Sequence, residues 1–175
     1  MIESKKVTET SEKLSVVVKQ MLEPFNITGG LPEGFWRDPY ALGFLQGTLV
    51  TLAKIASRGE LEGKKVAQVA LNVFKATVPG RGAEIYNNAV TYYSQANPSY
   101  LDAMSAGMMS IAVIYGSDDF NENPDVKKAR AMAEEALAET GREGDTPSSA
   151  EVGSMLQYML FQTAVSERLG RKYPQ

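Results

Sequence analysis

The side chains best suited to molecular recognition lie in one aromatic segment between residues 31 and 44. It carries Phe35, Trp36, Arg37, Tyr40 and Phe44. Tryptophan, tyrosine and arginine supply much of the energy of protein interfaces, so this set would form a contact site if it were exposed. Large aromatic side chains also stabilise protein cores, and the same set would close one end of a helical bundle if it were buried. We predict an interaction site at these five residues if they are exposed, and of the two interpretations the sequence favours burial.

A second set of residues could bind a small molecule or an anion. Arg81 lies between two glycines just before a predicted helix, whose free backbone amides would attract a phosphate or a carboxylate. An ordinary interhelical turn explains the same glycines. Tyr86 and Tyr93 carry hydroxyls that could line a polar pocket, and Met108 offers a flexible apolar wall. We predict a ligand or anion site at these four residues. Further tyrosines and methionines that could line such a pocket are Tyr92, Tyr100, Met104, Met155 and Met159.

Catalysis and metal binding have little support in the sequence. The chain has no histidine and no cysteine, which excludes Ser-His-Asp triads, thiolate nucleophiles and imidazole metal sites. Asp119, Asn121 and Asn123 alternate like the first ligands of a calcium loop. Pro124 then stands where that loop needs glycine, and Arg130 stands where it needs glutamate. We therefore predict a non-catalytic protein without catalytic residues, metal site or cofactor.

Composition indicates one ordinary globular domain over residues 1–175, with fraying expected in the polar first ten residues. Apolar residues make up 43% of the chain and charged residues 22%, which suits a folded core. The 18 basic and 21 acidic residues give a net charge of -3, and no basic cluster is present, so nucleic-acid binding is not expected. No run is long and apolar enough for a signal peptide or a membrane span, so we predict a cytoplasmic protein without membrane insertion.

Helix starts are marked by one recurring device, a capping side chain followed by proline. The capping oxygen accepts a free amide of the first turn, and proline at the first helical position fixes φ without wasting a donor. This device occurs at Asp38-Pro39, Asn97-Pro98, Asn123-Pro124 and Thr146-Pro147. The spacing Ser148-x-x-Glu151 adds a capping box at the last of these starts.

Apolar periodicity then predicts an all-α, single-domain bundle of six to seven helices. Strand signals are nearly absent, and an irregular loop is expected at about residues 24–38 because Pro24 ends the first helix and glycines follow it. The fifth helix is apolar nearly all round and should be central, whereas the narrow apolar stripe of the sixth places it at the periphery. The expected helices are 4–23, 39–57, 61–78, one across 85–96, one from 98, 124–140 and 148–169.

Two functional hypotheses follow from these features. The first is association, with a second copy or with another protein, through helix faces and the aromatic segment. The second is small-molecule or anion binding in a pocket between helices lined by methionine and tyrosine. The spacing Gly43-x-x-x-Gly47 predicts close packing against another helix of the same chain, since glycine in a helix is usually kept where space is short.

Overall fold

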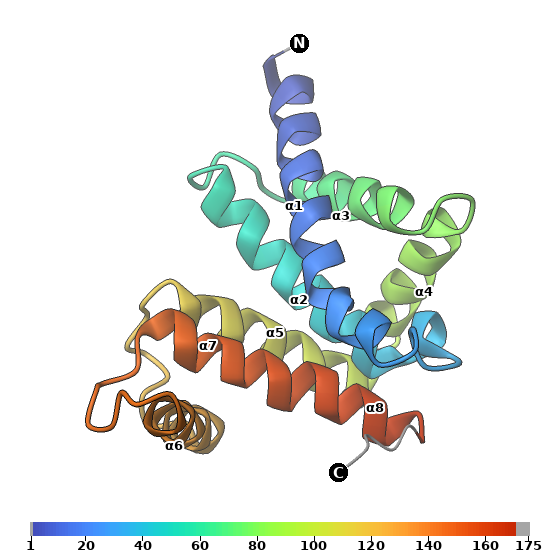
Figure 1. Cartoon of the computed structure of the whole chain (residues 1–175). Coiled ribbons are helices and arrows are strands. Elements are labelled where there is room, and N and C mark those ends of the chain that lie inside the picture. Colours follow the sequence, from blue (N-terminus) through green and yellow to red (C-terminus); the bar gives the residue numbers. More distant parts are fainter. Residues whose placement is uncertain (1, 171–175) are drawn as a thin grey trace.

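The computed structural model describes residues 2–170, and it is helical throughout its regular part (Figure 1). No strand occurs in that range, which confirms the predicted all-α bundle. The last three helical segments follow one another without a break, so the described chain forms seven helices and one separate 3-10 helix of three residues. They are α1 (Ile2–Ile27), η1 (Phe35–Arg37), α2 (Pro39–Ala56), α3 (Lys64–Thr77), α4 (Gly82–Ser94), α5 (Pro98–Ile114), α6 (Pro124–Glu139), α7 (Ser149–Gln157), η2 (Tyr158–Thr163) and α8 (Ala164–Arg168).

Three of the predicted caps form as expected. The side chains of Asp38, Asn97 and Asn123 accept hydrogen bonds from backbone amides in the first turns of α2, α5 and α6. The prediction at Thr146 is wrong, because Ser148 caps α7 instead. Ser148 and Glu151 bond reciprocally in a complete capping box, which satisfies two free amides where threonine two residues earlier would satisfy fewer.

The first helix differs from the prediction at its C-terminal end. α1 runs through Pro24 to Ile27 rather than ending at residue 23. Phe25 is fully buried, so tertiary packing holds the turn that lacks one amide at Pro24. The Thr28 hydroxyl donates to the Pro24 carbonyl at 2.9 Å and closes the end of the helix. At the other end, where fraying was expected, the chain is helical from Ile2.

The helices pack in layers around the α2–α5 pair (Figure 1). These two helices run parallel and make the most extensive contact in the described chain. α1 and α3 cover one side, α7 packs on α5 from the other side, and α6 contacts α7 at the outside. α4 lies across the end of the pair between α3 and α5.

Glycines allow the central pair to approach backbone to backbone. A Cβ on Gly43 would overlap the carbonyl oxygen of Tyr100, and a Cβ on Gly47 would overlap that of Met104. Gly107 of α5 meets the Phe44 carbonyl in the same way. The predicted role of the Gly43-x-x-x-Gly47 spacing is therefore observed, with α5 as the partner helix.

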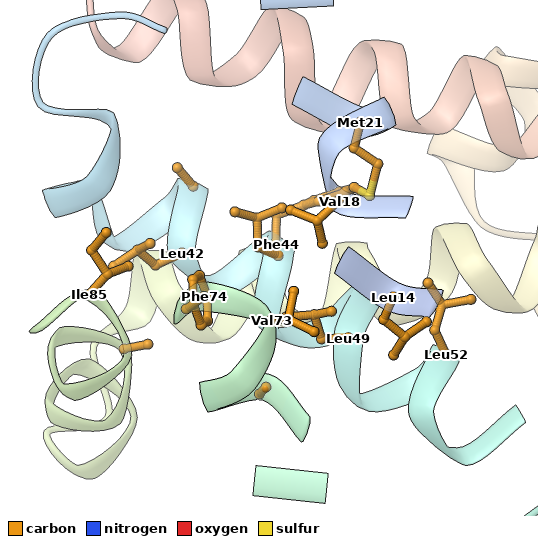
Figure 2. Close-up of a cluster of buried hydrophobic side chains, with 14 of the residues drawn as sticks. Leu14, Val18, Met21, Leu42, Phe44, Leu49, Leu52, Val73, Phe74 and Ile85 are labelled. Carbon is orange, nitrogen blue, oxygen red and sulfur yellow. The ribbon is translucent and has the colours of Figure 1, made fainter. Parts of the chain in front are cut away.

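Apolar side chains from the first four helices form the main core (Figure 2). The residues labelled there come from α1, α2, α3 and α4, and they are Leu14, Val18, Met21, Leu42, Phe44, Leu49, Leu52, Val73, Phe74 and Ile85. A smaller cluster joins α5, α6 and α7 through Met109, Val113, Val126, Ala129, Val152 and Leu156. Among the described helices, none combines the length and the apolar character needed to cross a membrane.

Candidate functional site

Two of the five aromatic-segment residues are core residues. Phe35 is 1% exposed and Phe44 is 0% exposed. Phe161 of η2 stacks on Phe44 with ring centroids 4.8 Å apart, and it meets the edges of Phe25 and Phe35. Burial is therefore the correct interpretation for Phe35 and Phe44, and neither side chain can reach a partner from the folded chain.

The other three residues of the segment are at least partly accessible, and they contact other elements of the fold. Tyr40 donates its hydroxyl to the Leu160 carbonyl at 2.8 Å, and the guanidinium of Arg168 lies 5.1 Å from the centre of its ring. Burial raises the pKa of the Tyr40 hydroxyl. Arg37 is exposed, and its backbone carbonyl accepts a hydrogen bond from Tyr92 at 2.7 Å. Half-buried Trp36 borders a hollow of about 450 Å³ between α1 and α3.

The residues predicted to bind a ligand or an anion divide into two groups. Arg81 is held by Glu84 at 3.2 Å, and this hydrogen bond raises the pKa of Arg81 and lowers that of Glu84. Glu84 thus supplies the negative charge that a bound anion would bring to the start of α4. Met108 is 39% exposed on α5, outside the pocket described next. Tyr86 and Tyr93, by contrast, line one pocket together.

We call this cavity the tyrosine pocket. It has a volume of about 180 Å³ and lies between α2, α4 and α5. Its α4 wall consists of side chains spaced by one and two helical turns, and its α5 wall of two side chains one turn apart. The lining residues are Gln46, Tyr86, Ala89, Val90, Tyr93, Tyr100 and Met104. None of these residues carries a formal charge at neutral pH.

The polar atoms of the tyrosine pocket lack partners within the described chain. The side-chain oxygen Oε1 of Gln46 is buried and accepts no hydrogen bond. Tyr40 and Tyr92 donate their hydroxyls to backbone carbonyls, whereas those of Tyr86, Tyr93 and Tyr100 make no such bond to residues 2–170.

The phenols of Tyr86 and Tyr100 have raised pKa values. Burial raises the pKa of the Tyr86 hydroxyl and, more strongly, that of the Tyr100 hydroxyl. The interactions of Tyr100 with Tyr86 and Tyr93 raise its pKa further. Protonated phenols can donate and accept hydrogen bonds, so the tyrosines, together with Gln46, are the polar side chains of the pocket.

Gln46 lines the pocket but was not predicted as one of its residues. The available signal was a single amide side chain inside the otherwise apolar first half of α2, directly before Gly47. Tyr100 and Met104 were recognised by residue type, but they were not placed with Tyr86 and Tyr93. Their contact depends on α4 folding back across the α2–α5 pair, which no local pattern encodes.

A second concave region lies where α6 crosses α7. Two hollows of about 450 and 390 Å³ meet there and share Ala136, Ser154 and Met155. The first is bordered by Arg142 and Glu151, which pair at 3.3 Å. The second is bordered by further apolar side chains and by two carboxylates, namely Met132, Tyr158, Glu135 and Glu139.

Across residues 2–170, the fold is all-helical, with a small pocket of uncharged side chains between α2, α4 and α5 and two apolar-floored hollows where α6 crosses α7. Within the described residues, no group of three or more acidic side chains is arranged to hold a metal ion. We found no significant match between this chain and any family model, curated protein or solved structure.

Proposed function

We propose that this chain is a small-molecule-binding protein whose ligand occupies the tyrosine pocket. The observation that carries the proposal is the cavity of about 180 Å³ between three helices, whose wall combines tyrosine rings, apolar side chains and Gln46. Rotation of the Gln46 side chain toward a ligand N–H or O–H would give its unpartnered Oε1 a donor and recover the roughly 1–3 kcal/mol that an unsatisfied buried polar group costs.

The lining of the pocket supports the same proposal. Binding sites for small molecules combine apolar and aromatic walls with a few polar groups that converge on the ligand. Here Ala89, Val90 and Met104 provide the apolar wall, while Gln46 and the tyrosines provide the polar groups. The absence of histidine and cysteine from the chain favours binding over chemical turnover.

Replacement of Gln46 tests this proposal because it has opposite effects on stability and binding. Gln46→Leu removes the unsatisfied oxygen, so we expect the melting temperature of the free protein to rise by a few degrees. Ligand binding should weaken at least tenfold. A screen of uncharged one- and two-ring compounds by NMR would identify ligands through the tyrosine signals of the pocket.

Gln20→Leu is the matched control, because Gln20 is exposed on α1 and does not line the tyrosine pocket. It should leave the ligand affinity unchanged and should not raise the melting temperature of the free protein. If no uncharged compound perturbs the pocket tyrosines of the unmodified chain, the proposal is wrong.

Self-association through the crossing of α6 and α7 is a second candidate function. It is favoured by the two adjoining hollows with an apolar floor, since soluble proteins rarely leave such surface uncovered. Twofold pairing would cover the apolar floor of each copy with that of the other. Such self-complementary pairing is the commonest form of dimer.

Light scattering tests self-association directly, because it measures the mass of the particle in solution. A self-associating chain should give about twice its 19.0 kDa monomer mass at micromolar concentration. Met155→Glu, which places a charge at the shared floor of the hollows, should return it to the monomer mass. Ser105→Glu on the exposed face of α5 is the control and should leave the mass unchanged. A monomer at all accessible concentrations would refute self-association.

A further inference from the structure

The two adjoining hollows at the crossing of α6 and α7 share an apolar floor, and we call them together the α6–α7 surface. Met155 belongs to both hollows, Met132 borders the second, and Tyr158 beside it is 47% exposed. The remaining apolar side chains of the floor are Ala133, Ala136, Leu137 and Ala150. Methionine adapts its shape to a partner, and tyrosine and methionine are enriched in protein interfaces. The floor therefore suits an apolar face of another protein segment.

The chain around this surface is strongly acidic. Residues 131–158 carry six acidic side chains and one basic side chain. The basic one is Arg142, which pairs with Asp145 at 2.9 Å and with Glu151 at 3.3 Å. Its positive charge is thus compensated within the chain, and an excess of negative charge surrounds the apolar floor.

Two carboxylates on the surface itself are available to a partner. Glu135 and Glu139 border the second hollow and are exposed. Neither pairs with a basic side chain within residues 2–170. Glu139 also lies in the last turn of α6, which contains no basic residue, so its charge adds to the negative end of the helix dipole. A positively charged group from outside the chain would be favoured at this position.

The length of the floor suits an amphipathic helix. Along α7 it extends from Ala150 to Tyr158, which corresponds to about 12 Å, or just over two turns of helix. A helix that docks in a groove inserts apolar side chains spaced by three and four residues, so two or three such side chains would cover this floor.

Charge distinguishes the possible partners. A second copy would bring the same excess of carboxylates to the surface, and like charges that face each other across an interface are unfavourable. A helix with basic side chains beside its apolar stripe would instead pair with Glu135 and Glu139. Figure 1 shows α6 on the outside of the molecule, where a partner helix can approach it.

We infer that the α6–α7 surface docks a basic amphipathic helix of another protein. The apolar stripe of that helix lies on the methionine and tyrosine floor, and its lysine or arginine side chains reach Glu135 and Glu139. This inference goes beyond the small-molecule function proposed for the tyrosine pocket, and it gives the surface a different partner from the second copy considered above.

Three synthetic peptides test the chemistry of the partner. The probe is a fluorescein-labelled helix-forming peptide of about four turns, with leucines on one face and lysines on the other. Its acidic counterpart has glutamate in place of each lysine, and a scrambled peptide has the same composition as the probe without an apolar face. Titration with the full chain, followed by fluorescence anisotropy, gives the three affinities. We expect the basic amphipathic peptide to bind about tenfold more tightly than either control and to lose affinity as salt is added.

Charge variants locate the binding on the molecule. Glu135→Gln combined with Glu139→Gln should weaken binding of the basic peptide about fivefold. Glu12→Gln combined with Glu62→Gln changes the net charge equally at exposed positions outside both hollows, and it should have little effect. This comparison separates docking at the α6–α7 surface from attraction by the net charge of the whole chain.

A second pair of variants tests the apolar floor. Tyr158→Ala removes the exposed ring at the edge of the floor and should weaken binding of the basic peptide about tenfold. Tyr115→Ala is the control, because Tyr115 is 61% exposed and borders neither hollow. It should leave the affinity unchanged.

Several results would overturn the inference. Among them are failure of the basic amphipathic peptide to bind, and binding of the acidic or scrambled peptide with equal affinity. Equal effects of the two pairs of charge variants, or of the two tyrosine variants, would show that the peptide binds elsewhere. A dimer that Met155→Glu dissociates would assign the surface to a second copy instead. None of these results bears on the tyrosine pocket, so the function proposed for that pocket stands or fails separately.

Discussion

Replacement of Gly47 by alanine is expected to destabilise the folded chain by about 3 kcal/mol, at the upper end of the cost of overpacking a core. The added Cβ would overlap the backbone carbonyl oxygen of Met104, which cannot rotate away as a side chain can. The α2–α5 pair would have to separate along the most extensive helix contact in the described chain. The gain in helix propensity from glycine to alanine, about 1 kcal/mol, is too small to compensate. Urea denaturation followed by circular dichroism measures the change.

Gly153→Ala provides a matched control for Gly47→Ala. A Cβ at Gly153 first meets the Cγ1 atom of the Ile114 side chain, which can adopt another rotamer. The loss should therefore be smaller, about 1 kcal/mol, and the additional change Ile114→Ala should reduce the clash. An equal or smaller loss at Gly47 than at Gly153 would show that the α2 and α5 backbones are not in close contact.

Features of the fold that depend on neighbouring residues were predictable from the sequence. The caps at Asp38, Asn97 and Asn123 were predicted because a capping side chain acts within its own helix turn. The C-terminal end of α1 was mispredicted because the burial of Phe25 by distant residues outweighs the local effect of Pro24. Where local and tertiary effects on a helix end conflict, sequence patterns indicate only the local effect.

The same distinction explains the partial prediction of the candidate site. Tyr86 and Tyr93 lie two helical turns apart, so their shared face of α4 could be inferred from spacing. Gln46 could not be linked to them, because the close approach of α2 and α5 through Gly47 places it beside α4. Whether Phe35 is buried or exposed was also undetermined, since the rings that enclose it come from α1 and η2.

The π-helical turn η2 shows most clearly what sequence periodicity cannot predict. Periodicity predicted one regular helix from residue 148 to 169, but Tyr158–Thr163 widens into a π-helix. A π-turn weakens the regular hydrogen-bond ladder, and the Leu160 carbonyl within it accepts the Tyr40 hydroxyl. The same turn carries Phe161, which is completely buried among Phe25, Phe35 and Phe44. The widened turn thus accompanies the fit of this ring between α1 and α2.

Phe161→Ala should accordingly destabilise the chain by about 3–5 kcal/mol, the usual cost of removing a buried phenylalanine and leaving a cavity. The loss has two causes: the ring is 0% exposed, and it contacts three other phenylalanines. Phe161→Leu keeps most of the apolar volume and should cost about 1.5 kcal/mol, with the remaining loss due to the aromatic contacts. Phe120→Ala, at a partly exposed site outside the four-ring cluster, should cost less than half as much as Phe161→Ala. Urea unfolding of the three variants gives these values, and a loss at Phe161 no larger than that at Phe120 would mean that the four-ring cluster does not hold η2 against α1 and α2.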